Sequence, residues 1–440
     1  MKIIVSVISL TICISAWSQQ TISISSTEKK ALIDSIKKRL ERYYVFPDKG
    51  REIGEYLAKQ WNAKSYDGIS DYNLLLDSLA ADIDRVHQDP HLRLGYDPGY
   101  AKHLKEKKRN TAPSPERVEA EKAFNRKNNY GFLKTEILPG NIGYISIIEF
   151  SKLNEESESI VAAAFDFIAY ADAVIIDLRS NTGGQPEMVQ KILSYFFEKP
   201  VHTSSTYDRE TNKTTENYSL ATVRGKKAQT KKLYILTSQN TFSAGEALPY
   251  TMKNLKRATI VGEVTAGAAH GMKGFIVNDK VVIEIPYMRG IDPVTKTDWE
   301  GVGVQPDITI KADKALAKAQ QVFMEEALAK VTEPGEKFAL EWALLSVKAE
   351  LAPVIISDEL KNEYAGNYGV RNISIEDGHL IFQKGDGPKR KLYPLSEDTF
   401  ELEGVDNYRI RFVRSTGGKV DKFIGSNNYN VTTEFLRNTN

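Results

Sequence analysis

A serine between an apolar run and a helix-compatible segment has the clearest capacity for chemistry. Residues 232–246 read KLYILTSQNTFSAGE, and Ser243 follows a strand-like run that ends at Leu236. A serine at the tip of a strand–turn–helix unit lies beside free backbone N–H groups of the helix N-terminus, where it can attack a carbonyl carbon. The alternative is that Ser243 only caps the helix, because serine is a preferred N-cap residue. This stretch by itself leaves both interpretations open.

A glycine pair follows a second apolar run. Residues 173–177 read AVIID, and the chain continues to Gly183 and Gly184 through the sequence LRSNT. Glycines let backbone N–H groups approach a ligand oxygen, as an oxyanion hole requires, although most glycine pairs are turns. The stretch lacks the Gly-Lys-Ser/Thr of a phosphate loop and the third glycine of a dinucleotide fingerprint. A nucleotide site is therefore not predicted here.

Three titratable side chains could assist a serine. His91 follows Asp89 in DPHLRL, Glu300 lies in TDWEGVGVQPD, and His270 is nearer to Ser243 along the chain. Histidine is the usual general base near neutral pH, and a glutamate can orient a histidine or a hydroxyl. Each residue alone equally fits a structural or surface position.

Taken in order, these motifs resemble the tail-specific, or C-terminal-processing, serine peptidase family. The resemblance covers residues 28–310 and implies an α/β fold with a crotonase-like core of stacked ββα units, an N-terminal helical cap and a small C-terminal all-β domain. The matching motifs are Asp89-x-His91-x-x-Leu94, Asp177-x-Arg179-x-Asn181-x-Gly183-Gly184, Thr241-x-Ser243-Ala244-x-Glu246, the GEVTAG of 262–267 and the EGVGVQPD of 300–307.

Branches of this family differ in their catalytic base. The tail-specific branch uses a lysine just after the Gly-Glu-x-Thr-x-Gly stretch, and here that position is Ala268, so a Ser–Lys dyad is not expected. The missing PDZ-like insertion of this chain favours the tricorn-like branch, which includes the interphotoreceptor retinoid-binding protein modules. That branch uses a histidine from the helical N-terminal region and a glutamate near the end of the core, and His91 and Glu300 match these. The tricorn pattern has a further polar residue in its catalytic relay, a serine immediately before the histidine. This chain has Pro90 there, so that member of the relay is absent or is replaced by Asp89 or by water.

The resemblance implies a peptidase that forms an acyl-enzyme on peptide or protein substrates, without metal or organic cofactor. The alternative is a protein on the same fold that binds apolar ligands or peptides and is catalytically weak. His270 is the rival base, and it otherwise fits a wall or substrate-binding position. The expected catalytic residues are Ser243, His91 and Glu300, and the expected oxyanion or substrate-binding residues are Ala244, Gly183, Gly184 and His270.

The composition predicts a soluble globular protein, and the first residues predict export. The chain has 440 residues, a net charge of +1 and 41% hydrophobic residues, which gives no reason to expect nucleic acid as a partner. Residues 1–18 read as a signal peptide, with a positive start, an apolar core and a small-x-small cleavage site. The one cysteine, Cys13, lies inside it. We therefore expect a cysteine-free mature chain in the periplasm, cell envelope or extracellular space, without stable membrane insertion.

The elements that must position these residues follow from hydrophobic periodicity. Apolar residues recur at spacings of three and four between residues 27 and 88, which predicts helices separated at Pro47. Strand-like and helix-like segments then alternate, which predicts an α/β core, and strands separated by turn signals dominate the C-terminal part. The predicted divisions are a signal peptide (1–18), a helical cap (27–100), a charged linker (101–135), the α/β core (136–312), a helical connector (313–351) and a small β-barrel-like or β-sandwich domain (352–440).

Overall fold

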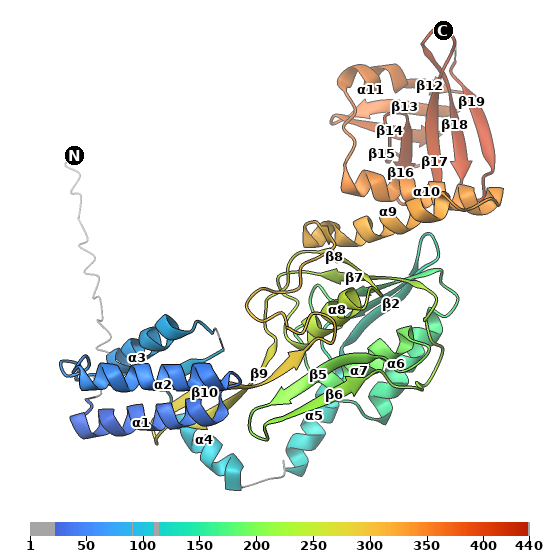
Figure 1. The fold of residues 1–440 in the computed structure, drawn as a ribbon. Coiled ribbons are helices and arrows are strands. Elements are labelled where there is room, and N and C mark those ends of the chain that lie inside the picture. Colours follow the sequence, from blue (N-terminus) through green and yellow to red (C-terminus); the bar gives the residue numbers. More distant parts are fainter. Residues whose placement is uncertain (1–22, 90, 110–113, 439–440) are drawn as a thin grey trace, which may run out of the picture. The chain divides into compact units, whose positions relative to one another are not determined.

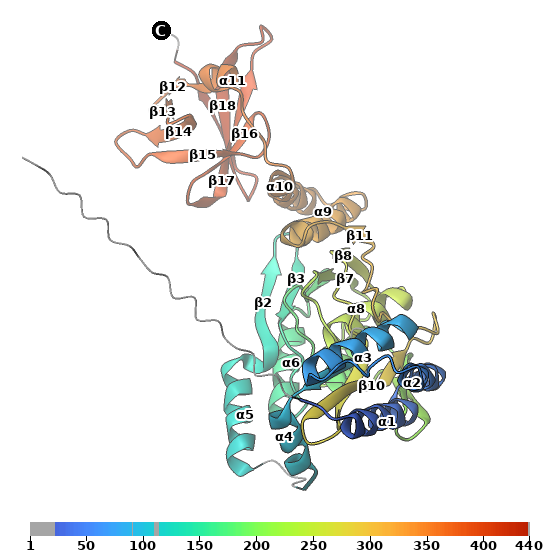
Figure 2. The same ribbon diagram turned by 90° about the vertical axis from the view of Figure 1, so that its left-hand side faces the viewer.

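The computed structural model describes residues 23–89, 91–109 and 114–438 (Figure 1, Figure 2). The predicted signal peptide, with Cys13, and the position of Pro90 lie outside these residues. No helix within the described ranges combines the length and the apolar character that crossing a lipid bilayer requires.

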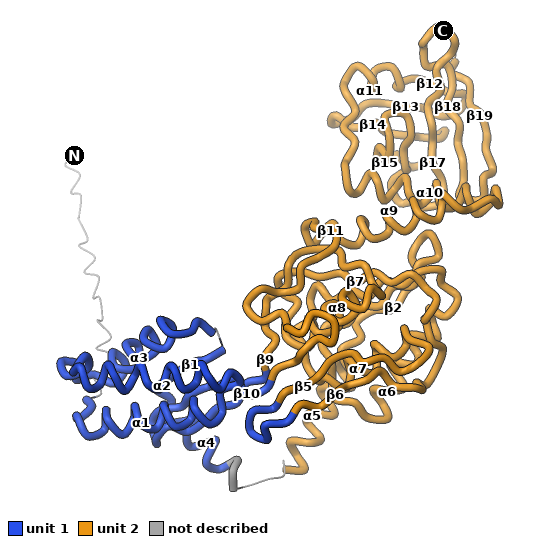
Figure 3. The backbone as a smooth tube through the Cα atoms, in the orientation of Figure 1, with its two compact units in different colours: residues 1–112, 208–213, 271–288 blue, residues 113–207, 214–270, 289–440 orange. Residues whose placement is uncertain are grey.

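The chain divides into two compact units (Figure 3). Unit 1 takes its described residues from 1–112, 208–213 and 271–288. Unit 2 takes its residues from 113–207, 214–270 and 289–440. Two stretches of unit 1 therefore come from sequence that lies far beyond its helices.

Helices form the N-terminal part of unit 1. The first begins after Ser25, whose side chain accepts the Glu28 N–H at 3.3 Å while the Glu28 carboxylate accepts the Ser25 N–H at 2.9 Å. This capping box satisfies donors that a helix start leaves free. Pro47 occupies the first turn of the second helix, where its missing N–H costs nothing, so the predicted separation at this residue is confirmed. The helices are α1 (Ser26–Tyr43), α2 (Pro47–Asn62), α3 (Tyr72–Val86) and α4 (Pro98–Arg109).

A returning segment completes unit 1. Strand β1 (Arg93–Tyr96) pairs antiparallel with β10 (Val281–Ile291), with Arg93 opposite Glu284 and Tyr96 opposite Val281. Strand β9 (His270–Ile276) also pairs with β10. Residues 271–288 lie in the range that the sequence analysis assigned to the α/β core, and the ladder with β1 joins them to unit 1 instead.

A six-stranded sheet lies at the centre of unit 2, in the order β11-β8-β7-β4-β3-β2 (Figure 1). All pairs are parallel except β2 with β3. Ile176 lies opposite Ile235 and Asp177 opposite Leu236, so the carboxyl ends of β4 and β7 meet at one edge. The strands are β2 (Phe132–Leu138), β3 (Ile142–Ile147), β4 (Ala173–Asp177), β7 (Lys232–Thr237), β8 (Thr259–Gly262) and β11 (Ile308–Thr309).

Helices cover both faces of this sheet, which explains why the apolar β4 is buried along its whole length. Val174 and Ile176 pack with one set of helices, and Ala173 and Ile175 pack with the other, as the two-residue period of a strand requires. The first set is α6 (Glu155–Phe167), α7 (Pro186–Leu193) and α8 (Ala244–Asn254), and the second is α9 (Ala315–Leu328) and α10 (Pro334–Leu351).

The stretch predicted as a charged linker contains helices. It holds most of α4 and all of α5 (Pro115–Lys127), which buries none of its side chains. Ser114 caps α5 by accepting the N–H of Arg117 at 3.3 Å. The charged residues of this stretch therefore belong to a solvent-exposed helix and not to an irregular linker. Elsewhere along the chain lie the short helices η1 (Asn129–Gly131), η2 (Ser194–Phe196) and η3 (Ala312–Lys314) and the adjacent strands β5 (His202–Asp208) and β6 (Lys213–Tyr218).

The C-terminal part is an eight-stranded antiparallel sheet whose strands follow chain order (Figure 2). Its apolar cluster shares no member with the clusters on the six-stranded sheet. The Asn438 N–H donates to the Asn367 carbonyl at 2.8 Å, which returns the chain to its first strand in a barrel-like closure. After α11 (Asp358–Tyr364) the strands are β12 (Gly366–Tyr368), β13 (Arg371–Glu376), β14 (His379–Lys384), β15 (Arg390–Pro394), β16 (Thr399–Leu402), β17 (Val405–Arg414), β18 (Val420–Asn427) and β19 (Thr432–Leu436).

Candidate active site

Ser243 lies in the turn that joins β7 to α8, half-buried, with φ of 54° and ψ of −122°. An ordinary N-cap residue is extended, and a positive φ is uncommon outside glycine. Strained strand-to-helix turns of this kind expose the side chain of the nucleophile in α/β-hydrolases. The Glu246 N–H donates to the Ser243 carbonyl at 2.8 Å, so this first-turn donor does not need the hydroxyl as its cap.

A buried carboxylate anchors this turn. Glu246 is fully buried, and its Oε2 accepts the N–H groups of Ser243 at 2.8 Å and Ala268 at 2.9 Å. Its Oε1 accepts the Thr265 hydroxyl at 2.5 Å and the Gly267 N–H at 2.6 Å. Four donors on one carboxylate compensate its burial. The sequence analysis missed this role, although Ser-x-x-Glu before a helix is the signal of a capping box.

Asn181 joins the glycine loop to the serine turn. It is fully buried, and its Oδ1 accepts the Gly183 N–H at 2.9 Å while its Nδ2 donates to the Ile147 carbonyl at 3.0 Å. Its own carbonyl accepts the Phe242 N–H at 3.0 Å. Asn181 therefore holds three separate chain segments in register, a role that no local pattern in the sequence indicated.

The glycine pair requires the absence of side chains. Gly183 and Gly184 have φ of 98° and 128°, in the region that favours glycine. A Cβ added to Gly183 would lie 2.9 Å from the Cβ of Ser243, and one added to Gly184 would lie 2.1 Å from the Phe150 carbonyl oxygen. The backbone at Gly183 therefore lies directly against Ser243, as the order of β4 and β7 at the sheet edge allows.

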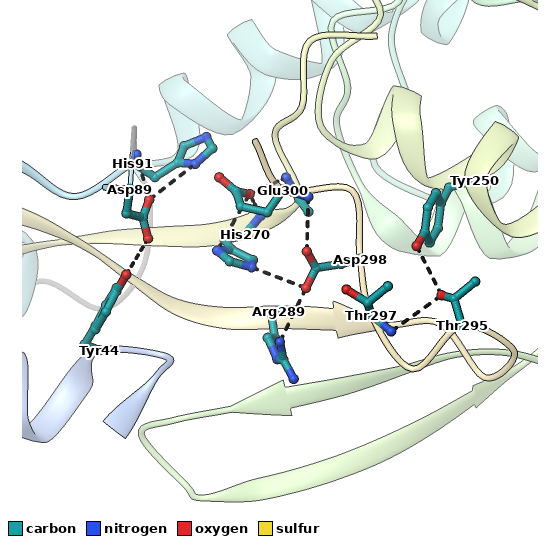
Figure 4. Close-up of polar contacts among 11 residues, drawn as sticks. Tyr44, Asp89, His91, Tyr250, His270, Arg289, Thr295, Thr297, Asp298 and Glu300 are labelled. Atoms are coloured by element: carbon teal, nitrogen blue, oxygen red, sulfur yellow. Dashed lines mark hydrogen bonds and ion pairs between the residues drawn. The ribbon is translucent and has the colours of Figure 1, made fainter. Parts of the chain in front are cut away.

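His270 lies in an acidic cluster of unit 2 (Figure 4). Its Nε2 is 3.4 Å from Asp298 Oδ2 and its Nδ1 is 3.7 Å from Glu300 Oε2. Glu300 Oε2 also accepts the N–H groups of Ala269 at 2.7 Å and His270 at 2.9 Å. Both ring nitrogens therefore face carboxylates, and the imidazole is only 1% exposed.

Asp298 is held as a carboxylate. Burial raises the pKa of its carboxyl, but the bond to His270, the charge of His270, the backbone N–H of Glu300 and the charge of Arg289 together lower this pKa below its ordinary value. The Glu300 N–H donates to Asp298 Oδ1 at 3.1 Å, and Arg289 lies 3.7 Å from Oδ2.

His91 lies in unit 1, where Asp89 orients it (Figure 4). Its backbone N–H donates to Asp89 Oδ1 at 2.9 Å, and its Nδ1 is 3.9 Å from the same oxygen. The Tyr44 hydroxyl donates to Asp89 Oδ2 at 2.7 Å. Asp89 and His91 are both buried, so the aspartate fixes the loop that carries this histidine.

The predicted site residues belong to both units. Hydrogen bonds in unit 2 link the Ser243 turn through Glu246 to Ala268, and two residues later the chain is bonded to Glu300. The unit 2 residues are Ser243, Ala244, Gly183, Gly184, His270 and Glu300, and His91 belongs to unit 1.

Two family profiles match adjacent parts of the chain. Residues 141–310 match peptidase family S41, and residues 18–139 match the N-terminal domain of peptidase S41 in eukaryotic interphotoreceptor retinoid-binding protein. This chain belongs to peptidase family S41. The predicted resemblance is confirmed, and the S41 fold here is a mixed α/β core with a helical N-terminal part and a β-rich C-terminal part.

Relatives of this S41 chain are named as processing proteases. Carboxyl-terminal-processing peptidase 2 of Arabidopsis thaliana, a chloroplastic protein, is 29% identical over 198 residues, which cover 42% of this chain and 36% of that protein. The carboxyl-terminal-processing protease of Synechocystis is 30% identical over 176 residues, 39% of each chain. This S41 chain thus spans little more than a third of the length of these curated relatives. The solved photosystem II D1 C-terminal processing protease is 15% identical, with a TM-score of 0.44 over 66% of this chain and 94% of that one.

Proposed function

We propose that this protein is a serine peptidase that hydrolyses peptide bonds through an acyl-enzyme on Ser243. The observation that carries the proposal is the strained Ser243 turn, with the Gly183 backbone directly against it. An ordinary helix cap needs neither feature. The S41 relatives named as proteases support the same reaction class.

In the proposed reaction, the Ser243 hydroxyl oxygen attacks the peptide carbonyl carbon as a base removes its proton. The N–H groups of Ala244 and of the glycine pair stabilise the resulting oxyanion, each contributing about 3 kcal/mol. Because the Gly183 N–H is bonded to Asn181, Gly184 is the better second donor. The base then protonates the leaving amine, and water releases the acyl group.

We assign the base to His91, because motif order matches it to the family and Asp89 fixes its backbone. Glu300 completes the polar relay in this proposal, and its two backbone bonds hold its carboxylate in place. His270 remains the rival, but its Nε2 is directed to Asp298. We therefore give His270 a positioning or substrate-binding role.

The wider architecture belongs to the same proposal. We infer that the six-stranded sheet is a crotonase-like core, supported by its parallel β3-β4-β7-β8 order with helices on both faces. The predicted domain divisions and export through residues 1–18 are likewise proposed. Peptides or proteins outside the cytoplasm would then be the substrates.

A fluorophosphonate probe tests the nucleophile on the mature chain, residues 19–440. We expect labelling of the folded wild type, and its loss both in Ser243→Ala and in protein denatured before the probe is added. Labelling that persists in Ser243→Ala would refute the assignment. A folded wild type that neither takes the probe nor cleaves peptides would favour the alternative of a binding protein.

The base is tested with a fluorogenic peptide library. His91→Ala should lower kcat by about 10² to 10⁴, the contribution typical of a general base. His270→Ala should retain more of the turnover. The reverse order would transfer the role of base to His270.

A further inference from the structure

Unit 1 contains a cavity of about 680 Å³ whose residues play no part in the proposed reaction. Its walls come from α1, α4, residue 210 and β9, all within unit 1. The cavity combines unpaired positive charge, an aromatic wall and one edge of a sheet. These three properties together define the class of ligand that it can take.

The charge of the cavity is strongly positive. Lys38, Arg39 and Arg42 line it from α1 and Lys273 lines it from β9, while Glu210 is the only carboxylate in its wall. Glu210 is already bonded to Lys273 at 2.7 Å. Within the described part of the chain, the three α1 cations have no carboxylate at ion-pair distance.

Arg39 is the least exposed of the three α1 cations. Its guanidinium is half-buried and donates to the Ser35 carbonyl of its own helix at 3.1 Å. Burial lowers the pKa of Arg39, yet arginine keeps its charge in proteins. A half-buried charge without a counterion is stabilised when an anion enters.

Aromatic rings form the apolar part of the wall. Tyr43 stacks on Phe275 with ring centroids 4.2 Å apart. Arg42 lies 5.1 Å from the centre of the Tyr43 ring, and Lys273 lies 5.7 Å from that of Phe275. Apolar groups placed between the negative charges of a ligand would contact these rings.

Strand β9 supplies a backbone edge. Its pairing among the described strands is with β10 alone, so its other edge is open. The cavity is lined by every residue from Met272 to Ile276. Because successive side chains of a strand point to opposite faces, a cavity that touches all of them runs along the strand edge. An open edge of this kind accepts an added strand through backbone hydrogen bonds.

We propose that this groove, the β9 groove, binds an extended acidic peptide as an additional strand on β9. Its Asp or Glu side chains lie against Lys38, Arg39 and Arg42, and its apolar side chains contact the Tyr43–Phe275 stack. The strand edge selects a peptide over an anionic lipid, since only a peptide offers backbone donors and acceptors at strand spacing. The inference goes beyond the peptidase reaction and needs no turnover.

Binding is measured by fluorescence anisotropy with the full mature chain carrying Ser243→Ala, so that no peptide is consumed. The probe is a labelled peptide of about ten alternating Glu and Val residues, long enough to span β9. A Lys/Val peptide is the charge control. A Glu/Val peptide with alternate backbone nitrogens methylated is the strand control. We expect binding of the acidic peptide only, with the methylated form weaker by about tenfold because it loses backbone hydrogen bonds.

Matched variants locate the site. Arg39→Gln with Arg42→Gln should weaken binding by about tenfold or more, as the loss of charged partners implies. Lys37→Gln should not, because Lys37 lies next to Lys38 in α1 but is 3.7 Å from Glu41 and does not line the cavity. The single variant Arg42→Gln, with an exposed side chain, serves if the double variant melts early by circular dichroism.

Three outcomes would overturn the proposal. They are equal binding of acidic and basic peptides, equal effects of the Arg39/Arg42 and Lys37 variants, and full affinity of the methylated peptide. Suppose that the methylated peptide binds with full affinity and is also displaced by phosphatidylglycerol vesicles. That pair of results would overturn the peptide proposal and identify the cavity as an anion site for lipid headgroups. Probe labelling of Ser243 is read separately, so a failure of the peptidase proposal would not be confused with a failure of this one.

Discussion

At the scale of single residues, several hydrogen bonds from buried side chains and backbone groups hold the turn that contains Ser243. Ser243 carries positive φ, which costs of the order of 1–3 kcal/mol and persists only when its surroundings enforce it. Glu246 and Asn181 supply that enforcement, since the Glu246 carboxylate accepts the Ser243 N–H and the Asn181 backbone carbonyl accepts the Phe242 N–H. The residues that hold the turn are therefore not the ones expected to react.

Replacing Glu246 with glutamine tests the anchor. The amide keeps the shape but turns one acceptor oxygen into a donor that faces backbone N–H groups, so buried donors lose their partner. We expect the free energy of unfolding to fall by about 3 kcal/mol, measured by urea denaturation. Glu187→Gln, on an exposed position of α7, is the control and should change little. Equal effects of the two changes would contradict the anchoring role.

Gly183→Ala tests the close approach of the two loops. The new Cβ would lie 2.9 Å from Ser243 Cβ at a φ of 98°, so the serine turn must shift. Displacements of about 1 Å at a reacting group cost about a hundredfold in rate, and we expect fluorophosphonate labelling to slow by that order. Gly290→Ala is the matched control, because nothing lies within 4 Å of its Cβ position. A labelling rate equal to that of Gly290→Ala would show that the contact is unimportant.

At the scale of elements, one loop carries a pH-dependent contribution to stability. Asp298 lies after β10, and its pKa in the folded state is below the ordinary value of 3.8. A depressed carboxyl pKa stabilises the fold at pH above the unfolded value, and this stabilisation is lost as pH falls through the folded value. The cluster around His270 should therefore loosen in acid.

Asp298→Asn measures this linkage. The variant should be less stable than the wild type at neutral pH, because it loses the charge that bonds His270. The difference in unfolding free energy should shrink as the pH falls below about 4, where the unfolded carboxyl takes up its proton, and on through the lower pKa of the folded state. Urea denaturation across this pH range reads the difference directly. A gap that stays constant down to the acid limit would mean that the charge of Asp298 is not what stabilises the loop.

At the scale of the whole molecule, the C-terminal sheet has a core of its own. Its link to the preceding helix includes Arg409, which lies 3.8 Å from the Trp342 ring centre and donates to the Trp342 carbonyl at 2.6 Å. The apolar clusters on the six-stranded sheet have separate members. Damage to the C-terminal core should therefore stay local.

Phe423→Ala tests this independence. Phe423 is fully buried in the C-terminal cluster, and its truncation should cost about 3–5 kcal/mol there. A calorimetric scan should show a low-temperature transition for this part, while labelling of Ser243 at room temperature stays near that of the wild type. If labelling fell together with that transition, the two cores would form one cooperative unit.

The sequence by itself determined the elements and the order of the motifs. The apolar 173–177 strand, the helix break at Pro47 and the alternation of strands and helices were predictable, because each depends on spacing within a short window. The family assignment followed from motif order in the same way. The helical nature of the charged 115–127 stretch was missed, since an exposed helix carries little apolar periodicity.

Only the tertiary structure decided which distant residues share a contact. The pairing of β1 with β10 draws residues 271–288 into unit 1, and Glu246 receives donors from residues about twenty positions away. The ladder and the bonds from Gly267 and Ala268 to Glu246 use backbone N–H groups, which leave no local trace in the sequence because every residue except proline carries the same donor and acceptor. For Ser243, the sequence supplied a hydroxyl at a helix start, and the fold supplied the strained backbone that distinguishes it from a cap.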